Sequence, residues 1–439
     1  MKNISEIVTC VLDYGSFISL ADMMGQKCKT YFHSPFQQEY LCLEKCCIGD
    51  GFDSFERVDD YMEPEFYAKV DLWIFPDIGY GGFQRFLRRE GKAVWGSMGA
   101  SDLELYRTRF LKVIKELGLP VINSITCRGI TELTEHLKSV EDKWVKINRY
   151  RENQETFHWQ DWMHGQRDLE RLAHDFGPLK ERVVFVVQDC IKGEHDNPVL
   201  EVGYDGWFIT EPDGTPSFPP QTFQGYEAKN ELYLGSLLDY GDLPEAVQEA
   251  NKAFAPVLAE YGYRNFMATE IRIKDGTPYF IDPTCRMAGQ TQEHLLNTCT
   301  NLAEIIWAGA NGQVIKPEFS HQFAAESTLH YKGGSDCWKT LVVPESIEDK
   351  VKPYHCCFEG GAYQFPPHKT DELGVIIGQG DSIEDAVEDL KDNFAELEHE
   401  PVTINVAGFV ELIEQIQDAE EKGVEFSDQP VPAPETAIS

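Results

Sequence analysis

Two acidic residues are predicted to meet on a β-hairpin between residues 266 and 286. Its centre reads Lys-Asp-Gly-Thr-Pro, and Asp-Gly between β-branched and aromatic residues is typical of a tight turn. Side chains alternate between the two faces of a strand, so Glu270 and Arg272 share one face of the first strand. By the same rule Asp282, Thr284 and Arg286 share one face of the second strand.

The chemistry of these side chains suits a metal-bound nucleoside triphosphate. Carboxylate and hydroxyl oxygens are hard ligands of the kind that Mg²⁺ takes, and Arg286 offers a forked donor for phosphate oxygens. The alternative is a surface hairpin whose charges are simply solvated, which is common for an isolated acidic pair. Neighbouring motifs have to decide between the two interpretations.

The hairpin resembles the metal-binding strands of the ATP-grasp superfamily, and within it those of phosphoribosylamine-glycine ligase-like enzymes. That family places a Glu on one strand and Glu-x-Asn on the next to hold two Mg²⁺ ions, followed by an Arg that contacts phosphate. The resemblance implies that Glu270, Asp282 and Thr284 are metal ligands. It also implies that Arg286 is catalytic and binds ATP. At Thr284 a hydroxyl replaces the family's amide oxygen.

Two further cations fall in the family's order. Residues 103–120 are similar to a helix that carries a phosphate-binding Lys, and Arg107 occupies that position. Residues 144–148 resemble the strand whose Lys contacts the α-phosphate, which implies a cofactor-binding and catalytic Lys146. The alternative for Lys146 is an edge-strand side chain directed to water.

The next segment stands where the family has a glycine-rich flap over the phosphates. Residues 149–157 contain no glycine, so the backbone there cannot approach a phosphate as closely and side chains must supply the donors. By position these donors are Arg149, Arg151 and Thr156.

Residues 182–194 resemble the strand and hinge that hold adenine. The resemblance assigns Gln188, Asp189 and Cys190 to cofactor binding, with the Gln188 side chain and the Cys190 backbone at the adenine edge. Glu194, in the family's Gly-Glu, would bind the ribose hydroxyls. A buried strand that runs into a polar loop at a sheet edge is the alternative.

The fold class predicted is α/β (α+β), an ATP-grasp fold preceded by a parallel-sheet domain. Strand patterns at 7–12, 28–32 and 70–75 alternate with helical ones, such as 17–24, which favours a parallel sheet. Ligands bind at the carboxyl ends of such strands, so loops 13–16 and 77–82 are candidate substrate contacts. Residues 81–97 resemble the helix and strand that close the family's first domain.

The division predicted from these resemblances has three domains and a tail. They comprise an N-terminal domain at 1–100, an ATP-grasp domain at 101–322 with a small lobe at about 125–195, a C-terminal α+β domain at 323–426 and a disordered tail at 427–439. In the C-terminal domain a strand and glycine turn precede a helix for which Asp381 or Ser382 is a suitable N-cap.

Composition sets the outer limits on function and location. A formal net charge of -35 argues against a nucleic-acid or membrane surface, since both are polyanionic. The first 24 residues contain three acidic side chains and no sustained apolar core, so no secretory signal is expected. Among the 12 cysteines there is no Cys-x-x-Cys pair. We therefore expect a cytoplasmic protein with reduced thiols, while a zinc site combining cysteines across the fold stays open.

The resemblance implies an ATP-dependent carboxylate-amine ligase that uses Mg²⁺ or Mn²⁺. A substrate carboxylate attacks the γ-phosphate, and an amine displaces the resulting acylphosphate with release of ADP and phosphate. An amino acid is the expected class for one substrate, and Gln290, Gln292 and Glu293 are candidates to recognise its polar groups. Partners are then small carboxylates and amines, and the family allows a homodimer.

Three alternatives stay open at this stage. The chain could bind nucleotide without turnover, as a regulatory or scaffold subunit, because it lacks the glycine flap and carries Thr284. It could be a true phosphoribosylamine-glycine ligase, although the residues after Arg286 and after the first strand depart from that enzyme's pattern. It could also mimic a nucleic acid, but its acidic residues are spread along the chain.

Overall fold

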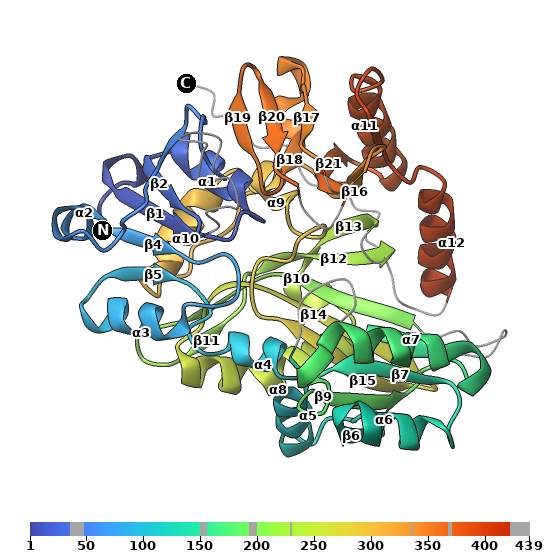
Figure 1. The fold of residues 1–439 in the computed structure, drawn as a ribbon. Coiled ribbons are helices and arrows are strands. Elements are labelled where there is room, and N and C mark those ends of the chain that lie inside the picture. The colour runs from blue at the N-terminus through green and yellow to red at the C-terminus, as the bar shows by residue number, and fades with distance from the viewer. Residues whose placement is uncertain are drawn as a thin grey trace.

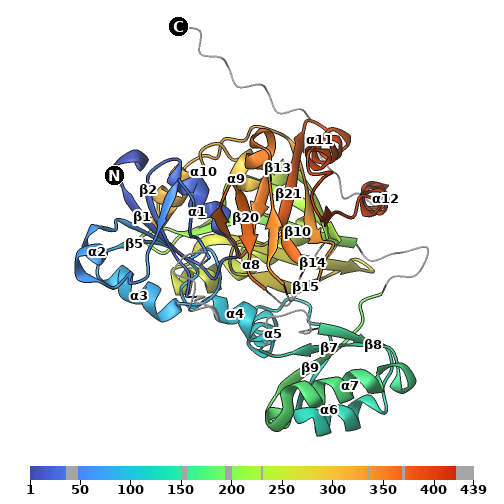
Figure 2. The same cartoon turned by 45° about the horizontal axis from the view of Figure 1, so that its top comes forward.

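The computed structural model, drawn in Figures 1 and 2, describes residues 1–35, 48–149, 156–192, 200–228, 231–334, 337–367 and 371–421. Its strands form sheets of five, ten, three and four strands. The predicted tail at 427–439 lies outside the described residues. The cysteines that the structure describes are free thiols. None of the described helices is both long and apolar enough to cross a lipid bilayer.

The first sheet is parallel, as predicted, and has the order β3-β2-β1-β4-β5. Its strands are β1 (Val8–Leu12), β2 (Lys29–His33), β3 (Phe55–Arg57), β4 (Leu72–Ile74) and β5 (Ala93–Trp95). The helices between them are α1 (Ile18–Gly25), α2 (Pro64–Lys69) and α3 (Gly81–Arg89). Strand β3 was not predicted. The strand order turns back between β1 and β4, so the loops after these two strands flank the switch point of the sheet.

The largest sheet is mainly antiparallel and has the main order β15-β14-β10-β12-β13-β16-β21-β18. Its strands are β10 (Leu200–Thr210), β11 (Pro216–Ser217), β12 (Gln221–Ala228), β13 (Leu232–Asp239), β14 (Arg264–Lys274), β15 (Thr277–Thr284), β16 (Phe323–Tyr331), β18 (Val351–Pro353), β21 (Glu372–Gly380) and β22 (Val402–Thr403). Because β13 pairs with β16, one sheet runs across residue 322. The domain division at that residue remains a prediction.

Helices pack beside this sheet, and a smaller sheet lies next to its C-terminal strands (Figure 1). The helices are α8 (Glu245–Tyr261), α9 (Leu295–Thr298), α10 (Leu302–Ala310), α11 (Ile383–Ala395) and α12 (Gly408–Glu421). The smaller sheet contains β17 (Lys339–Leu341), β19 (Cys357–Glu359) and β20 (Ala362–Phe365). Ser382 caps α11 by accepting a hydrogen bond from the Asp385 N–H at 3.0 Å, which confirms one of the two predicted caps. Short 3₁₀ helices occur at Ile4–Glu6, Gly177–Leu179, Tyr240–Asp242 and Glu345–Lys350.

The four-stranded sheet belongs to a unit that projects from the rest of the molecule, with its helices on the outer side (Figure 2). Its strands, β6 (Ser124–Arg128), β7 (Lys143–Ile147), β8 (Thr156–Trp159) and β9 (Val184–Asp189), have the antiparallel order β6-β9-β7-β8. The helices are α6 (Gly129–Leu137) and α7 (Trp162–Phe176). Buried Leu133, Val145, Trp159 and Phe185 belong to a separate hydrophobic core of this unit.

Two short helices link this unit to the parallel sheet, where one helix was expected. They are α4 (Ser101–Leu105) and α5 (Arg107–Glu116), and between them Tyr106 is extended, with φ −118° and ψ 91°. Asn148, just after β7, accepts hydrogen bonds from the Arg107 N–H through its carbonyl at 3.2 Å and from the Thr108 N–H through its side chain at 2.9 Å. These bonds satisfy N–H groups that a helix start leaves unpaired, so the break costs little.

The predicted hairpin is formed by β14 and β15. Lys274 pairs with Thr277 across the turn residues Asp275 and Gly276, whose φ angles are 51° and 73°. Two positive φ angles are those of a type I′ turn, the turn that matches the twist of its strands.

We expect Gly276→Ala to lower the free energy of unfolding by about 1 kcal/mol, because an L side chain is strained in the left-handed region. Apart from its chain neighbours, no described atom lies within 4 Å of a Cβ built at Gly276, so a clash does not contribute. Denaturant unfolding measures the effect, and Gly276→Asn is the control with a smaller loss, since Asn adopts this backbone more readily. Equal stability of wild type and the Ala variant would contradict the type I′ geometry.

Candidate functional site

A β-bulge decides which face of the hairpin carries the second carboxylate. Glu270 pairs with Asp282, but the next residue, Ile271, pairs with Phe280, so Ile281 has no partner of its own. Without the bulge Ile281 would stand opposite Glu270, and Asp282 would turn to the other face. Because residues directly opposite in an antiparallel pair share a face, the two predicted carboxylates lie side by side.

The Asp282 carboxylate is held by two cations from other parts of the chain. Arg107, the first residue of α5, lies 3.0 Å from Oδ1 through Nη1, and Lys146 of β7 lies 3.0 Å from Oδ2 through Nζ. Both cationic side chains are largely buried, at 13% and 12% exposure. Two buried cations thus meet at one carboxylate, and ammonium and guanidinium groups are also the donors from which phosphate oxygens accept hydrogen bonds.

Glu270 lies in a second charged group that the sequence did not reveal. The carboxylates of Glu201 on β10, Glu227 on β12 and Glu270 come within 4.8 Å of one another. Arg272 binds Glu201 at 2.9 Å and Glu270 at 3.3 Å. Burial, and then the charge of Glu270, raise the pKa of Glu201 to about 7. The register of β10 against β14 places Glu201 opposite Arg272 and so brings Glu201 into this group.

The residues at the end of β15 connect the hairpin to the parallel sheet. Arg286 binds Glu104 of α4 through Nε at 2.8 Å, and the same nitrogen is 3.8 Å from Asp77. Glu104 also accepts a hydrogen bond from the Cys285 N–H at 2.8 Å, and the Met287 N–H donates to the carbonyl of Pro76 at 2.8 Å. The guanidinium expected to contact phosphate is therefore oriented by acidic side chains that lie far from it in the sequence.

The loops after β1 and β4 supply two buried carboxylates near this end of the hairpin. Asp13 accepts hydrogen bonds from the N–H groups of Gly15 at 2.7 Å and Phe17 at 2.8 Å. Burial, and then the nearby Asp77, raise the pKa of Asp13 to about 7. Thus both loops predicted as substrate contacts lie at the switch point, and one of them reaches Arg286.

Comparisons with known proteins were informative only at the level of structure. No protein-family model matches the chain, and no curated protein matches its sequence. A phosphoribosylamine-glycine ligase from Thermotoga maritima is similar, with a TM-score of 0.63 and 13% identity over 90% of this chain and 99% of that one. An L-amino acid ligase from Bacillus licheniformis has a TM-score of 0.58 and 14% identity over 92% of this chain and 100% of that one.

A third similar structure is the biotin carboxylase domain dimer of 2-oxoglutarate carboxylase from Hydrogenobacter thermophilus, in complex with MgADP, ADP and bicarbonate. Its TM-score is 0.62, and 12% identity extends over 96% of each chain. The chain has the ATP-grasp fold. The predicted fold class is confirmed, and at these identities the likeness concerns the fold alone.

Within the ATP-grasp fold, the predicted flap residues lie beside β7. Thr156 begins β8 and pairs with Lys146, and the Arg149 guanidinium lies 5.0 Å from the centre of the Tyr106 ring. Arg151 lies outside the described residues. Thr284 pairs with Ala268 on the hairpin, so it shares the face of Asp282.

The predicted adenine hinge forms the end of β9, between β6 and β7. Gln188 is buried, and Asp189 is bound by Lys143 at 2.6 Å and by Asn123 at 3.0 Å. The hydrogen bond from Lys143 holds the pKa of Asp189 below its ordinary value. Cys190 follows the strand and is half-buried. Glu194 lies outside the described residues.

We expect Asp13→Asn to alter the pH dependence of stability. The folded pKa of about 7 lies above the ordinary 3.8, so between these values the folded state keeps a proton that the unfolded state has lost. Asp13 therefore makes the free energy of unfolding of the wild type decrease as the pH rises across that range. In the variant this contribution to the pH dependence is absent.

Thermal unfolding of both proteins at about pH 5 and about pH 8 measures this difference. The variant should gain stability relative to the wild type at the higher pH. A difference that is equal at both pH values would show that Asp13 does not bury a proton.

Proposed function

We propose that this protein is an ATP-dependent carboxylate-amine ligase. It activates a carboxylate as an acylphosphate, passes the acyl group to an amine and releases ADP and phosphate. The observation that carries the proposal is the meeting of Lys146, Arg107 and Asp282 from three separate elements beside Glu270, within an ATP-grasp fold. The solvated-hairpin interpretation leaves these two buried cations unexplained.

The donor set on the hairpin fits Mg²⁺, with Mn²⁺ as a related ion that takes the same oxygen ligands. Glu270, Asp282 and Thr284 are the proposed ligands, and Glu201 and Glu227 add carboxylate oxygens beside Glu270. A bound divalent ion supplies charge neutralisation to the triphosphate. The MgADP complex of the Hydrogenobacter domain supports nucleotide and metal as partners here.

The chain's own side chains supply positioning and positive charge. Lys146 and Arg107 would exchange the carboxylate of Asp282 for phosphate oxygens, and Arg286, held by Glu104, would stabilise charge on the phosphoryl group in transfer. The remaining proposed ATP contacts are Arg149, Arg151 and Thr156 for the phosphates, and Gln188, Asp189, Cys190 and Glu194 for the nucleoside.

The reaction needs no protein nucleophile, and the structure supports leaving Cys285 out of the chemistry. The residue is fully buried, and burial raises the pKa of its thiol well above the ordinary value. A protonated, inaccessible thiol is a poor nucleophile.

An amino acid is the proposed class for one substrate. Two of the similar proteins are, by their names, a glycine ligase and an L-amino acid ligase. In this chain Asp77 lies 3.8 Å from Arg286 at the switch point, so a carboxylate that can accept from an ammonium stands beside the guanidinium proposed to act on the phosphoryl group. The dimeric Hydrogenobacter domain supports a homodimer as the assembly to test.

A second candidate is nucleotide binding without turnover. It is favoured by the hydroxyl of Thr284 in the metal set and by the engagement of Arg286 with Glu104. A true phosphoribosylamine-glycine ligase is the third candidate, and it would release ADP only with phosphoribosylamine as the amine.

We expect Glu270→Gln and Asp282→Asn each to reduce ADP release by about a hundredfold or more, since loss of one charge-stabilising group at a transferring centre has effects of this size. ADP release is measured with Mg²⁺ over a panel of amino acids and amines. The matched control is Asp275→Asn, which removes a carboxylate from the tip of the same hairpin while Asn still tolerates the turn.

The control should release ADP at the wild-type rate. Turnover by the two variants at that rate would overturn the metal assignment. Nucleotide binding by the wild type without ADP release on any substrate would favour the non-catalytic candidate instead.

A further inference from the structure

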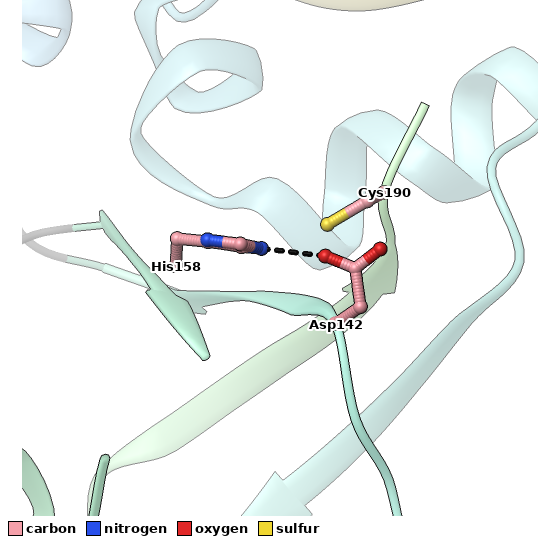
Figure 3. Close-up of side chains that lie close together, drawn as sticks. All are labelled: Asp142, His158 and Cys190. Carbon is pink, nitrogen blue, oxygen red and sulfur yellow. Dashed lines mark hydrogen bonds and ion pairs between the residues drawn. The ribbon is translucent and has the colours of Figure 1, made fainter. Parts of the chain in front are cut away.

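Three potential metal ligands of different chemistry meet at one end of the four-stranded sheet. They are Asp142, just before β7, His158 on β8 and Cys190, just after β9. Each offers a donor atom within 4.8 Å of the other two, and all three residues are half-buried. Figure 3 shows the imidazole and the sulfur directed toward the same carboxylate, and His158 Nε2 lies 2.7 Å from Asp142 Oδ1.

The strand pairing holds these side chains together. β7 lies between β8 and β9, and its residue Trp144 pairs with His158 on one side and Gln188 on the other. The rings of Trp144 and His158 are 5.2 Å apart, which restricts the imidazole. The Asp142 N–H donates to the carbonyl of Gln160 at 2.8 Å, so the turn that carries the carboxylate is tied to the strand of the histidine.

We propose that Asp142, His158 and Cys190 form a binding site for a thiophilic divalent cation of the Zn²⁺ class. An imidazole nitrogen, a sulfur and a carboxylate oxygen are the ligand types that Zn²⁺ takes, whereas Mg²⁺ takes oxygen. Three protein ligands leave the fourth tetrahedral position to water. The site is distinct from the oxygen-only group at Glu270 and does not depend on the proposed ligase activity.

The charges around the site define what a metal must displace. Lys192 Nζ lies 2.6 Å from Asp142 Oδ1 and its side chain is 59% exposed, so the ammonium can leave for solvent with its proton. Lys192, and more weakly His158, hold the pKa of Asp142 down at about 2, which keeps this ligand anionic.

The thiol supplies the proton that metal binding releases. Burial, and then Asp142, raise the pKa of Cys190 to about 11, so at neutral pH the sulfur is protonated. Binding forms a metal–sulfur bond, breaks the S–H bond and passes that proton to solvent, with no change of oxidation state.

The test is Zn²⁺ titration of the purified full chain against a chromophoric chelator, without nucleotide and with excess Mg²⁺. Cys190→Ser and His158→Gln should each weaken Zn²⁺ binding by at least about tenfold, since even outer-sphere changes have effects of this size. Cys337→Ser, which removes an exposed free thiol elsewhere, is the matched control and should bind like the wild type. Lys192→Met should bind more tightly, because it removes the competing cation.

Cd²⁺ titration followed by sulfur-to-metal charge-transfer absorption gives an independent readout. The band should be present in the wild type, Cys337→Ser and Lys192→Met, and lost in Cys190→Ser. Wild-type Zn²⁺ affinity in both Cys190→Ser and His158→Gln would overturn the site, and so would a Cd²⁺ band that survives without Cys190. Lys192→Met keeps all three ligands, so it tests the proposal even if a ligand variant fails to fold. Unchanged Zn²⁺ affinity of Lys192→Met would also count against the site.

Discussion

The single-residue bulge between Glu270 and Ile271 is the constraint on which the candidate site depends. Side chains on a strand alternate with a period of two, so one extra residue exchanges the faces of everything beyond it. With the bulge, the Asp282 carboxylate reaches Lys146 and Arg107; without it, the carboxylate would point toward the buried side of the sheet, beside Phe280 and Ile271. Removing an ionised carboxylate from water without a partner is costly, and the two cations would also lose their counter-charge.

A protein with a net charge of -35 can still bind a triphosphate. The electrostatic energy at a binding site depends on the charges close to it rather than on the net charge of the whole protein. Arg107 comes from helix α5, Lys146 from strand β7 and Arg286 from the segment just after β15, and each lies at or beside the hairpin. Each cation is paired with a carboxylate, and this pairing keeps the cations in place. When phosphate binds, each cation then exchanges one anionic partner for another, so the protein does not have to hold unpaired cations close together before binding.

The features that could be predicted are those with a local physical cause. Asp-Gly predicts its turn because both residues tolerate positive φ, and Ser382 predicts a helix start because its hydroxyl can accept from an N–H three residues on. Those that were missed arise from contacts between distant segments. Glu201 became part of the site through the register of β10 with β14, and Glu104 through the packing of α4 against the end of β15. The helix break at Tyr106 depends on hydrogen bonds that Asn148, about forty residues away, accepts from the first N–H groups of α5, and no local pattern at 103–117 contains that information.

By itself the sequence determined the hairpin and the alternation of strands and helices in the N-terminal part, because turn chemistry and hydrophobic periodicity act over a few residues. It also determined the residue types that suit an oxygen-bound metal and phosphate. Only the tertiary structure decided which of these residues meet. Whether Asp282 faces Glu270 and whether Asp142, His158 and Cys190 come together are questions of register between strands. Whether Lys146 reaches Asp282 depends on how two separate sheets pack against each other. Register is set by the burial of whole faces and by bulges, and these are properties of the packed sheet rather than of any one segment.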